Sequence, residues 1–205
     1  MRIERIEPSR RKGQLLLTLA GGDQLKITEQ ELLDFGLCAG DELDEETLAR
    51  LKKAAGVSGV KVTAADLVGR RTMSRRDLEK KLMVKGASEQ EARYAAEWLE
   101  AIGAIDDADY AARLVRHYGE LGYGPAYVRQ KLFEKGVPRE LWDEAMDALP
   151  DPAELIGRYL ESKLHGTLPD EKEKKRLTDA LLRRGFSWGE VRTAWNALGA
   201  DTWED

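Results

Sequence analysis

Few side chains in this 205-residue sequence have the type and spacing that catalysis requires. Cys38 could form a nucleophile pair with His117 or His165, but it lies in a loop-like GLCAGD segment, far from both in the sequence. Asp106 and Asp107 could act as paired carboxylates, although aspartate at the start of a predicted helix more often caps it. No phosphate-binding glycine motif is present. We therefore expect no catalytic residue, no metal site and no cofactor, and we expect that the protein is not an enzyme.

The stretch RRTMSRRDLEKKLMVKG, residues 70–86, has seven basic residues against two acidic ones. Such a stretch can bind phosphates or an acidic partner. It can also be the solvated side of a helix whose long side chains lie along apolar surface. At about 100° per residue on a helix, Leu78 and Leu82 face the core while Arg76 and Lys80 lie opposite. Arg75, Lys81 and Lys85 flank the apolar stripe, so the charges do not form one face and both interpretations stay open.

Composition narrows the class of protein. The net charge of −5 argues against general affinity for nucleic acid, which usually needs a basic surface. A single cysteine excludes an internal disulfide framework and suits a reducing cytosol. The sequence has no apolar secretory segment and no run long enough to span a membrane. We expect a cytoplasmic protein without membrane contact.

The first residues predict a small α+β module. Apolar and polar residues alternate in 2–7, and two strand-like runs at 13–20 and 24–28 flank a Gly-Gly-Asp turn. Because an isolated hairpin is marginal in water, the first run is expected to be a third strand. Two helices should follow, capped by Thr28 and Asp44 and ending at Gly36 and Gly56.

The rest of the chain contains an internal repeat. Residues 74–99, 124–149 and 173–198 align without gaps at offsets of 50 and 49 residues. Each segment predicts a helix, a stop at a glycine that follows a basic residue, and a second helix. Three sets of positions coincide: Leu82, Leu132 and Leu181; Met83, Phe133 and Leu182; and Gly86, Gly136 and Gly185.

Further helices are predicted before each pair, at 63–70, 106–121 and 151–164. The second helices should begin at capping boxes, Ser88 with Glu91 and Ser187 with Glu190, or with Pro138 in the first helical position. The expected fold is mainly α: three tandem three-helix repeats form an elongated curved array behind the small sheet module. The predicted boundaries are 1–59 for the module and 60–102, 103–150 and 151–205 for the repeats.

Charge differs between the repeats. Residues 60–102 carry nine bases and seven acids, whereas 103–149 carry six and nine, and 150–205 carry nine and eleven. The first repeat is therefore the candidate for contacts with phosphates or an acidic surface. Tyr123 and Trp203 are the aromatic residues expected to be free to contact a partner. The candidate partner- or DNA-binding residues are Arg70, Arg71, Arg75, Arg76, Lys80, Lys81, Arg113, Arg116, Arg129, Lys131, Arg183 and Arg184.

The junction between the first two repeats resembles that of the bacterial RecX family. In GAIDDADYAARLV, residues 103–115, Gly103, Ile105, Asp106, Asp107 and Tyr110 stand where the family has its junction motif. RTMSRRDLEKKL, residues 71–82, is similar to the opening of the family's first repeat. The resemblance covers about residues 60–198, and the start resembles the N-terminal extension of some members.

The resemblance implies a regulator of the RecA recombinase in homologous recombination, DNA repair and the SOS response. Family members bind the RecA filament on single-stranded DNA and inhibit its ATP hydrolysis, strand exchange and extension. An elongated monomer with weak direct DNA contacts is expected. Two alternatives stay open: a DNA-binding helical module that acts independently of RecA, and a helical-repeat adaptor without a role in recombination.

Overall fold

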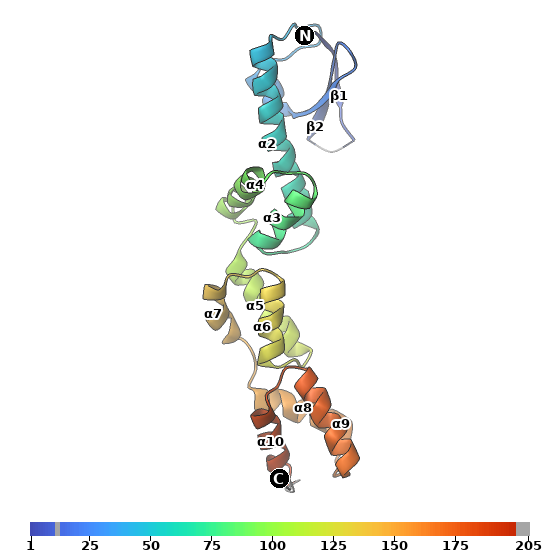
Figure 1. Ribbon diagram of the computed structural model, residues 1–205, viewed down its shortest axis with the longest axis vertical. Helices are drawn as coiled ribbons and strands as arrows, with labels where there is room; N and C mark the ends of the chain where they lie inside the picture. The colour runs from blue at the N-terminus through green and yellow to red at the C-terminus, as the bar shows by residue number, and fades with distance from the viewer. Residues whose placement is uncertain (11–12, 200–205) are drawn as a thin grey trace. The chain divides into compact units, whose positions relative to one another are not determined.

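A three-stranded antiparallel sheet forms the N-terminal part of the protein (Figure 1). The computed structural model describes residues 1–10 and 13–199. The strands are β1 (Ile3–Pro8), β2 (Gln14–Leu19) and β3 (Gln24–Thr28), in the order β1-β2-β3. Leu17 on the central strand is fully buried and lies opposite Ile6 and Leu25. The three predicted strands are therefore confirmed. Trp203, predicted to be free to contact a partner, lies outside the described residues.

Helices make up most of the remaining structure, which confirms the mainly α class. Capping boxes at Thr28, Ser88 and Ser187 begin α1, α4 and α10, as predicted. Pro138 precedes a 3-10 turn, so the single helix predicted to start there is wrong. The helices are α1 (Glu29–Asp34), α2 (Glu45–Arg70), α3 (Arg75–Val84), α4 (Glu89–Ala101), α5 (Asp107–Glu120), α6 (Pro125–Glu134), η1 (Arg139–Leu141), α7 (Trp142–Met146), α8 (Pro152–Leu164), α9 (Glu171–Arg183) and α10 (Trp188–Ala197).

Helix α2 runs without a break through Gly56, so the helix end predicted there is wrong. Its buried side chains, Leu51, Ala55 and Ala64, lie on both sides of the glycine. A glycine in a helix interior costs about 1 kcal/mol relative to alanine, and burial on both sides offsets that cost. The boundary predicted between residues 59 and 60 lies inside α2. The repeat boundaries themselves stay predictions.

The repeated glycines all end helices in the left-handed conformation. Gly86, Gly136 and Gly185 have φ values of +97°, +71° and +87°. The next N–H in each case donates to a carbonyl five residues back: Ala87 to Leu82 at 3.1 Å, Val137 to Leu132 at 3.0 Å and Phe186 to Leu181 at 3.3 Å. This is the Schellman arrangement, which satisfies carbonyls that a helix end leaves unpaired. The structure therefore confirms the glycine stops predicted from the repeat.

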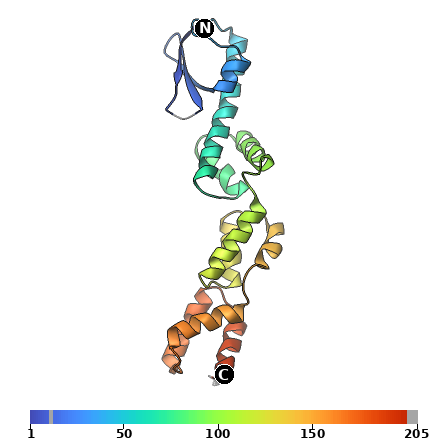
Figure 2. The same ribbon diagram turned by 180° about the vertical axis from the view of Figure 1, so that it is seen from behind.

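The chain divides into two compact units, and each has its own apolar core. The first unit contains residues 1–72 and 78–105, and the second contains 73–77 and the residues from 106 onward. In the first unit, Leu51 and Ala55 of α2 pack with the sheet. In the second unit, one cluster joins α5, α6 and α7, and another joins α8, α9 and α10 around the fully buried Trp195. Figure 2 shows the backbone of the chain from behind.

Within the second unit, the start of α6 lies against the end of α9. The N–H of Gly124 donates to the carbonyl of Arg184 at 2.8 Å, and the N–H of Ala126 donates to that of Gly185 at 3.1 Å. A Cβ on Gly185 would lie 2.4 Å from the backbone nitrogen of Tyr127, and a Cβ on Gly124 would lie 2.7 Å from the Gly185 carbonyl. Only glycine allows this close approach of two backbones.

We predict that Gly185→Ala destabilises the protein by about 3 kcal/mol, because left-handed strain adds to a backbone clash. Gly86→Ala is the matched control: it is at the equivalent repeat position with a similar φ, but nothing lies within 4 Å of the new Cβ. That variant should lose only about 1 kcal/mol. Urea unfolding followed by circular dichroism measures both, and equal losses would contradict the role of the close approach.

Candidate partner-binding surface

The predicted bases around α3 are divided between the two compact units. Arg75 and Arg76 belong to the second unit, and the other four belong to the first. Arg75 and Lys81 are half-buried, whereas the rest are exposed: Arg70, Arg71, Arg76 and Lys80. The aliphatic stem of Arg76 lies over Gly136. A Cβ added to that glycine would be 3.1 Å from the Cβ of Arg76. That these residues bind one partner stays a prediction.

The predicted bases of the second repeat differ in their local partners. Arg113 pairs with Asp109 at 2.7 Å, and Lys131 pairs with Glu134 at 2.7 Å. The hydrogen bond from Lys131 lowers the pKa of Glu134, and the same bond raises the pKa of Lys131. The Arg113 pair is exposed and contributes little to stability, whereas the Lys131 side chain is half-buried. Arg116 and Arg129 are exposed.

Arg184 has a structural role that the sequence did not indicate. Its guanidinium donates to the backbone carbonyls of Leu121 at 2.9 Å and Gly122 at 3.2 Å. Its charge lies over the rings of Tyr123, at 5.3 Å, and Tyr159, at 4.8 Å. These contacts join α9 to the turn before α6 and to α8. Its neighbour in the predicted set, Arg183, is exposed.

Tyr123 is not free, which corrects its prediction as a partner-contacting aromatic. Its ring stacks on Tyr127 with centroids 4.0 Å apart, and it meets Tyr118 edge to face at 5.9 Å. The side chain is half-buried. Stacked and edge-to-face aromatic pairs each stabilise a fold by about 1 kcal/mol beyond the area that they bury. Tyr123 therefore belongs to the packing around Arg184.

The residues considered for chemistry are separate from one another or serve the fold. Asp106 caps α5 by accepting from the N–H groups of Ala108 and Asp109, both at 2.9 Å. Asp107 accepts from the N–H of Arg75 at 2.8 Å. Cys38 is exposed. Within the described residues, no three His, Cys, Asp or Glu side chains are grouped so that they could hold a metal ion. None of the described helices combines the length and apolarity needed to cross a membrane.

Each repeat exposes an apolar side chain at the same position. The alignment of the three repeats placed these residues together, but it did not show that they are exposed. Met83 is 41% exposed, Phe133 is 62% exposed and Leu182 is 36% exposed. Arg129 precedes Phe133 by four residues on α6, and Lys80 precedes Met83 by three on α3, so each pair shares a helix face. Single exposed apolar residues are common, and what distinguishes these three is that they share one repeat position.

A small sheet followed by repeated three-helix units defines a class of mainly helical repeat proteins. Comparison of the sequence with known protein families supports this class. The sequence models of the RecX second and third three-helix domains match residues 106–146 and 154–195. A regulatory protein RecX of Stenotrophomonas maltophilia is 35% identical over 133 residues, which cover 64% of this chain and 82% of that protein. The RecX of Levilactobacillus brevis is 29% identical over 191 residues, 90% of this chain and 71% of the relative.

A solved structure agrees with these sequence matches. The crystal structure of a regulatory protein RecX superposes with a TM-score of 0.68 at 26% identity, and the match covers 95% of this chain and 98% of that one. The chain belongs to the RecX family of regulatory proteins.

We predict that Arg184→Gln destabilises the protein by about 2 kcal/mol, because it removes charged hydrogen bonds to two carbonyls and a cation–π contact. Arg183→Gln changes the same charge at the adjacent, exposed position and should have an effect within about 0.5 kcal/mol. Thermal unfolding of the two variants provides the comparison. Similar losses of stability would show that Arg184 does not hold the α9 end in place.

Proposed function

We propose that this protein binds the RecA recombinase filament on single-stranded DNA and inhibits its ATP hydrolysis, strand exchange and extension. It would thereby modulate homologous recombination and DNA repair. Membership of the RecX family supports the proposal, and the surface feature that carries it is the exposed apolar residue of each repeat. A filament repeats the same surface from subunit to subunit, and a repeat protein offers the same contact more than once.

The apolar residues are suited to bind protein. Interfaces between proteins depend on a few apolar or aromatic side chains, often with arginine nearby, that become buried in the partner. Phe133, with Arg129 four residues before it, has this composition. Nucleic-acid backbones, by contrast, are bound mainly through charge. The mixture of apolar and basic side chains therefore favours a protein partner, with DNA contacts secondary.

The action proposed is binding and not catalysis. Asp106 and Asp107, the carboxylates considered for acid–base chemistry, accept hydrogen bonds from backbone N–H groups. Arg184, one of the bases of the predicted set, supports packing. Regulation through contact with a filament requires only a complementary surface.

We predict that replacing the three repeated apolar residues, Met83, Phe133 and Leu182, by serine raises the half-inhibitory concentration in a RecA ATP-hydrolysis assay on single-stranded DNA. The rise should be at least about tenfold, because the loss of apolar anchors costs more than about 1 kcal/mol each. Leu33→Ser is the control, since Leu33 is 74% exposed on α1 and lies outside the repeats. If the wild-type protein leaves hydrolysis unchanged, the proposed function is wrong.

The same assay tests the basic stretch. An Arg70/Arg71/Arg75/Arg76→Ala variant should inhibit less well than wild type, and the difference should shrink as salt concentration rises, because salt screens exposed charges. Inhibition equal to that of wild type at low salt would assign the stretch to the solvated side of a helix. In that case the apolar positions would carry the contact without it.

A further inference from the structure

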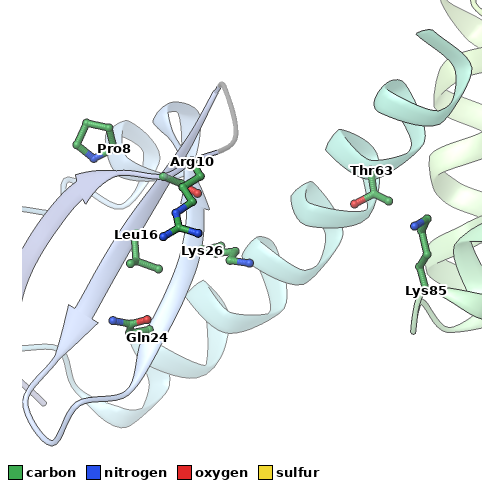
Figure 3. Close-up of a pocket in the computed structure, with 8 residues that line it drawn as sticks. Pro8, Arg10, Leu16, Gln24, Lys26, Thr63 and Lys85 are labelled. Atoms are coloured by element: carbon green, nitrogen blue, oxygen red, sulfur yellow. The ribbon is translucent and has the colours of Figure 1, made fainter. Parts of the chain in front are cut away.

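The first unit contains a groove of about 740 Å³, and the residues that the structure describes around it include three bases and no acidic residue. Arg10 comes from the turn after β1, Lys26 comes from β3, and Lys85 comes from the end of α3 (Figure 3). Gln24 and Thr63 also line it. Lys85 belongs to the basic stretch 70–86, but none of the three bases is in the candidate set predicted from the sequence. They come from three separate segments, and the sequence does not show that these segments meet.

The charges of the three bases are available to a ligand. Within the described part of the chain, the side chains of Arg10, Lys26 and Lys85 have no ion-pair or hydrogen-bond partner, and all three residues are exposed. Glu7 lies opposite Leu16 in the β1–β2 pair, but it is paired with Arg5 at 3.6 Å and does not line the groove. A concave surface with unpaired charges of one sign concentrates the opposite charge.

We propose that a strand of single-stranded nucleic acid binds in this groove through its phosphodiester backbone. Arg10, Lys26 and Lys85 would contact successive phosphates, and the amide of Gln24 would donate to a phosphate or sugar oxygen. A single strand can follow a concave surface, whereas duplex DNA is stiff over about 150 base pairs.

The lining favours nucleic acid over an acidic protein segment. Among the described residues that line it, Leu16 and Pro8 are the apolar ones, so the groove offers little to bury the apolar anchors on which protein interfaces depend. The described lining includes no aromatic residue, so base stacking does not contribute and binding should not depend on base sequence. This inference does not depend on the proposed action on RecA.

The test is the salt dependence of binding to a labelled oligothymidylate, measured by fluorescence anisotropy without recombinase. Lys26/Lys85→Gln should reduce the slope of log K against log salt by about 1.4, since each phosphate contact on a single strand contributes about 0.7. At about 0.1 M salt this corresponds to binding about 25-fold weaker. Lys52/Lys53→Gln is the matched control: it changes the charge equally, at exposed positions of α2 in the same unit that do not line the groove.

Any of the following results would overturn the proposal: no binding by wild type, an unchanged slope in Lys26/Lys85→Gln, an equal loss in the control, or equally tight binding to a duplex of the same length. Displacement of the oligonucleotide by polyglutamate as efficiently as by unlabelled thymidylate would assign the groove to an acidic protein instead. Circular dichroism of each variant verifies folding. Because no recombinase is present, a failure of the RecA proposal leaves these outcomes unchanged.

Discussion

The close approach of Gly124 to Gly185 is the contact on which the packing of the second unit depends. The end of one helix leaves carbonyls unpaired, and the start of another leaves N–H groups unpaired. Here the free N–H groups at the start of α6 donate to the free carbonyls at the end of α9. The two bonds run from Gly124 to Arg184 and from Ala126 to Gly185. The partial charges at the two helix ends are also opposite, so the contact is electrostatically favourable.

An equivalent joint occurs one repeat earlier. Ser74 aligns with Gly124 and Lys135 aligns with Arg184, and the hydroxyl of Ser74 donates to the carbonyl of Lys135 at 2.5 Å. Here a serine side chain makes the bond that a glycine N–H makes in the next repeat. The same hydroxyl accepts from the N–H of Asp77 at 3.1 Å, so it also caps α3. At both joints a carbonyl at a helix end accepts a hydrogen bond from the start of another helix. The donor is a serine hydroxyl in one joint and a glycine N–H in the other.

The base before each repeated glycine shows how one position has diverged. Arg184 binds carbonyls and tyrosine rings in the third repeat, whereas Lys85 lines the groove in the first. The sequence predicted the position, because helix termination is local and depends on the glycine and the residues beside it. It could not predict the difference, because the two carbonyls that Arg184 binds lie more than 60 residues away in the sequence. Gly56 was misread for a similar reason: burial of Leu51 and Ala64, which is tertiary, keeps α2 intact.

The acidity of the chain is largely explained by its helices, and this changes what a net charge of −5 implies for binding. Carboxylates accept N–H groups at helix starts, where the helix dipole also favours negative charge. Hydrogen bonds from Thr47 and Ser88 lower the pKa of Asp44 and Glu91, because these bonds stabilise the charged carboxylates. These carboxylates already bind N–H groups at helix starts. Bases such as Arg10, Lys26 and Lys85 have no comparable partner among the described residues. A protein can therefore be acidic in total and still offer a basic groove, so the distribution of charge, and not its sum, decides whether the protein binds nucleic acid. Asp106, Asp151 and Asp170 cap helices in the same way.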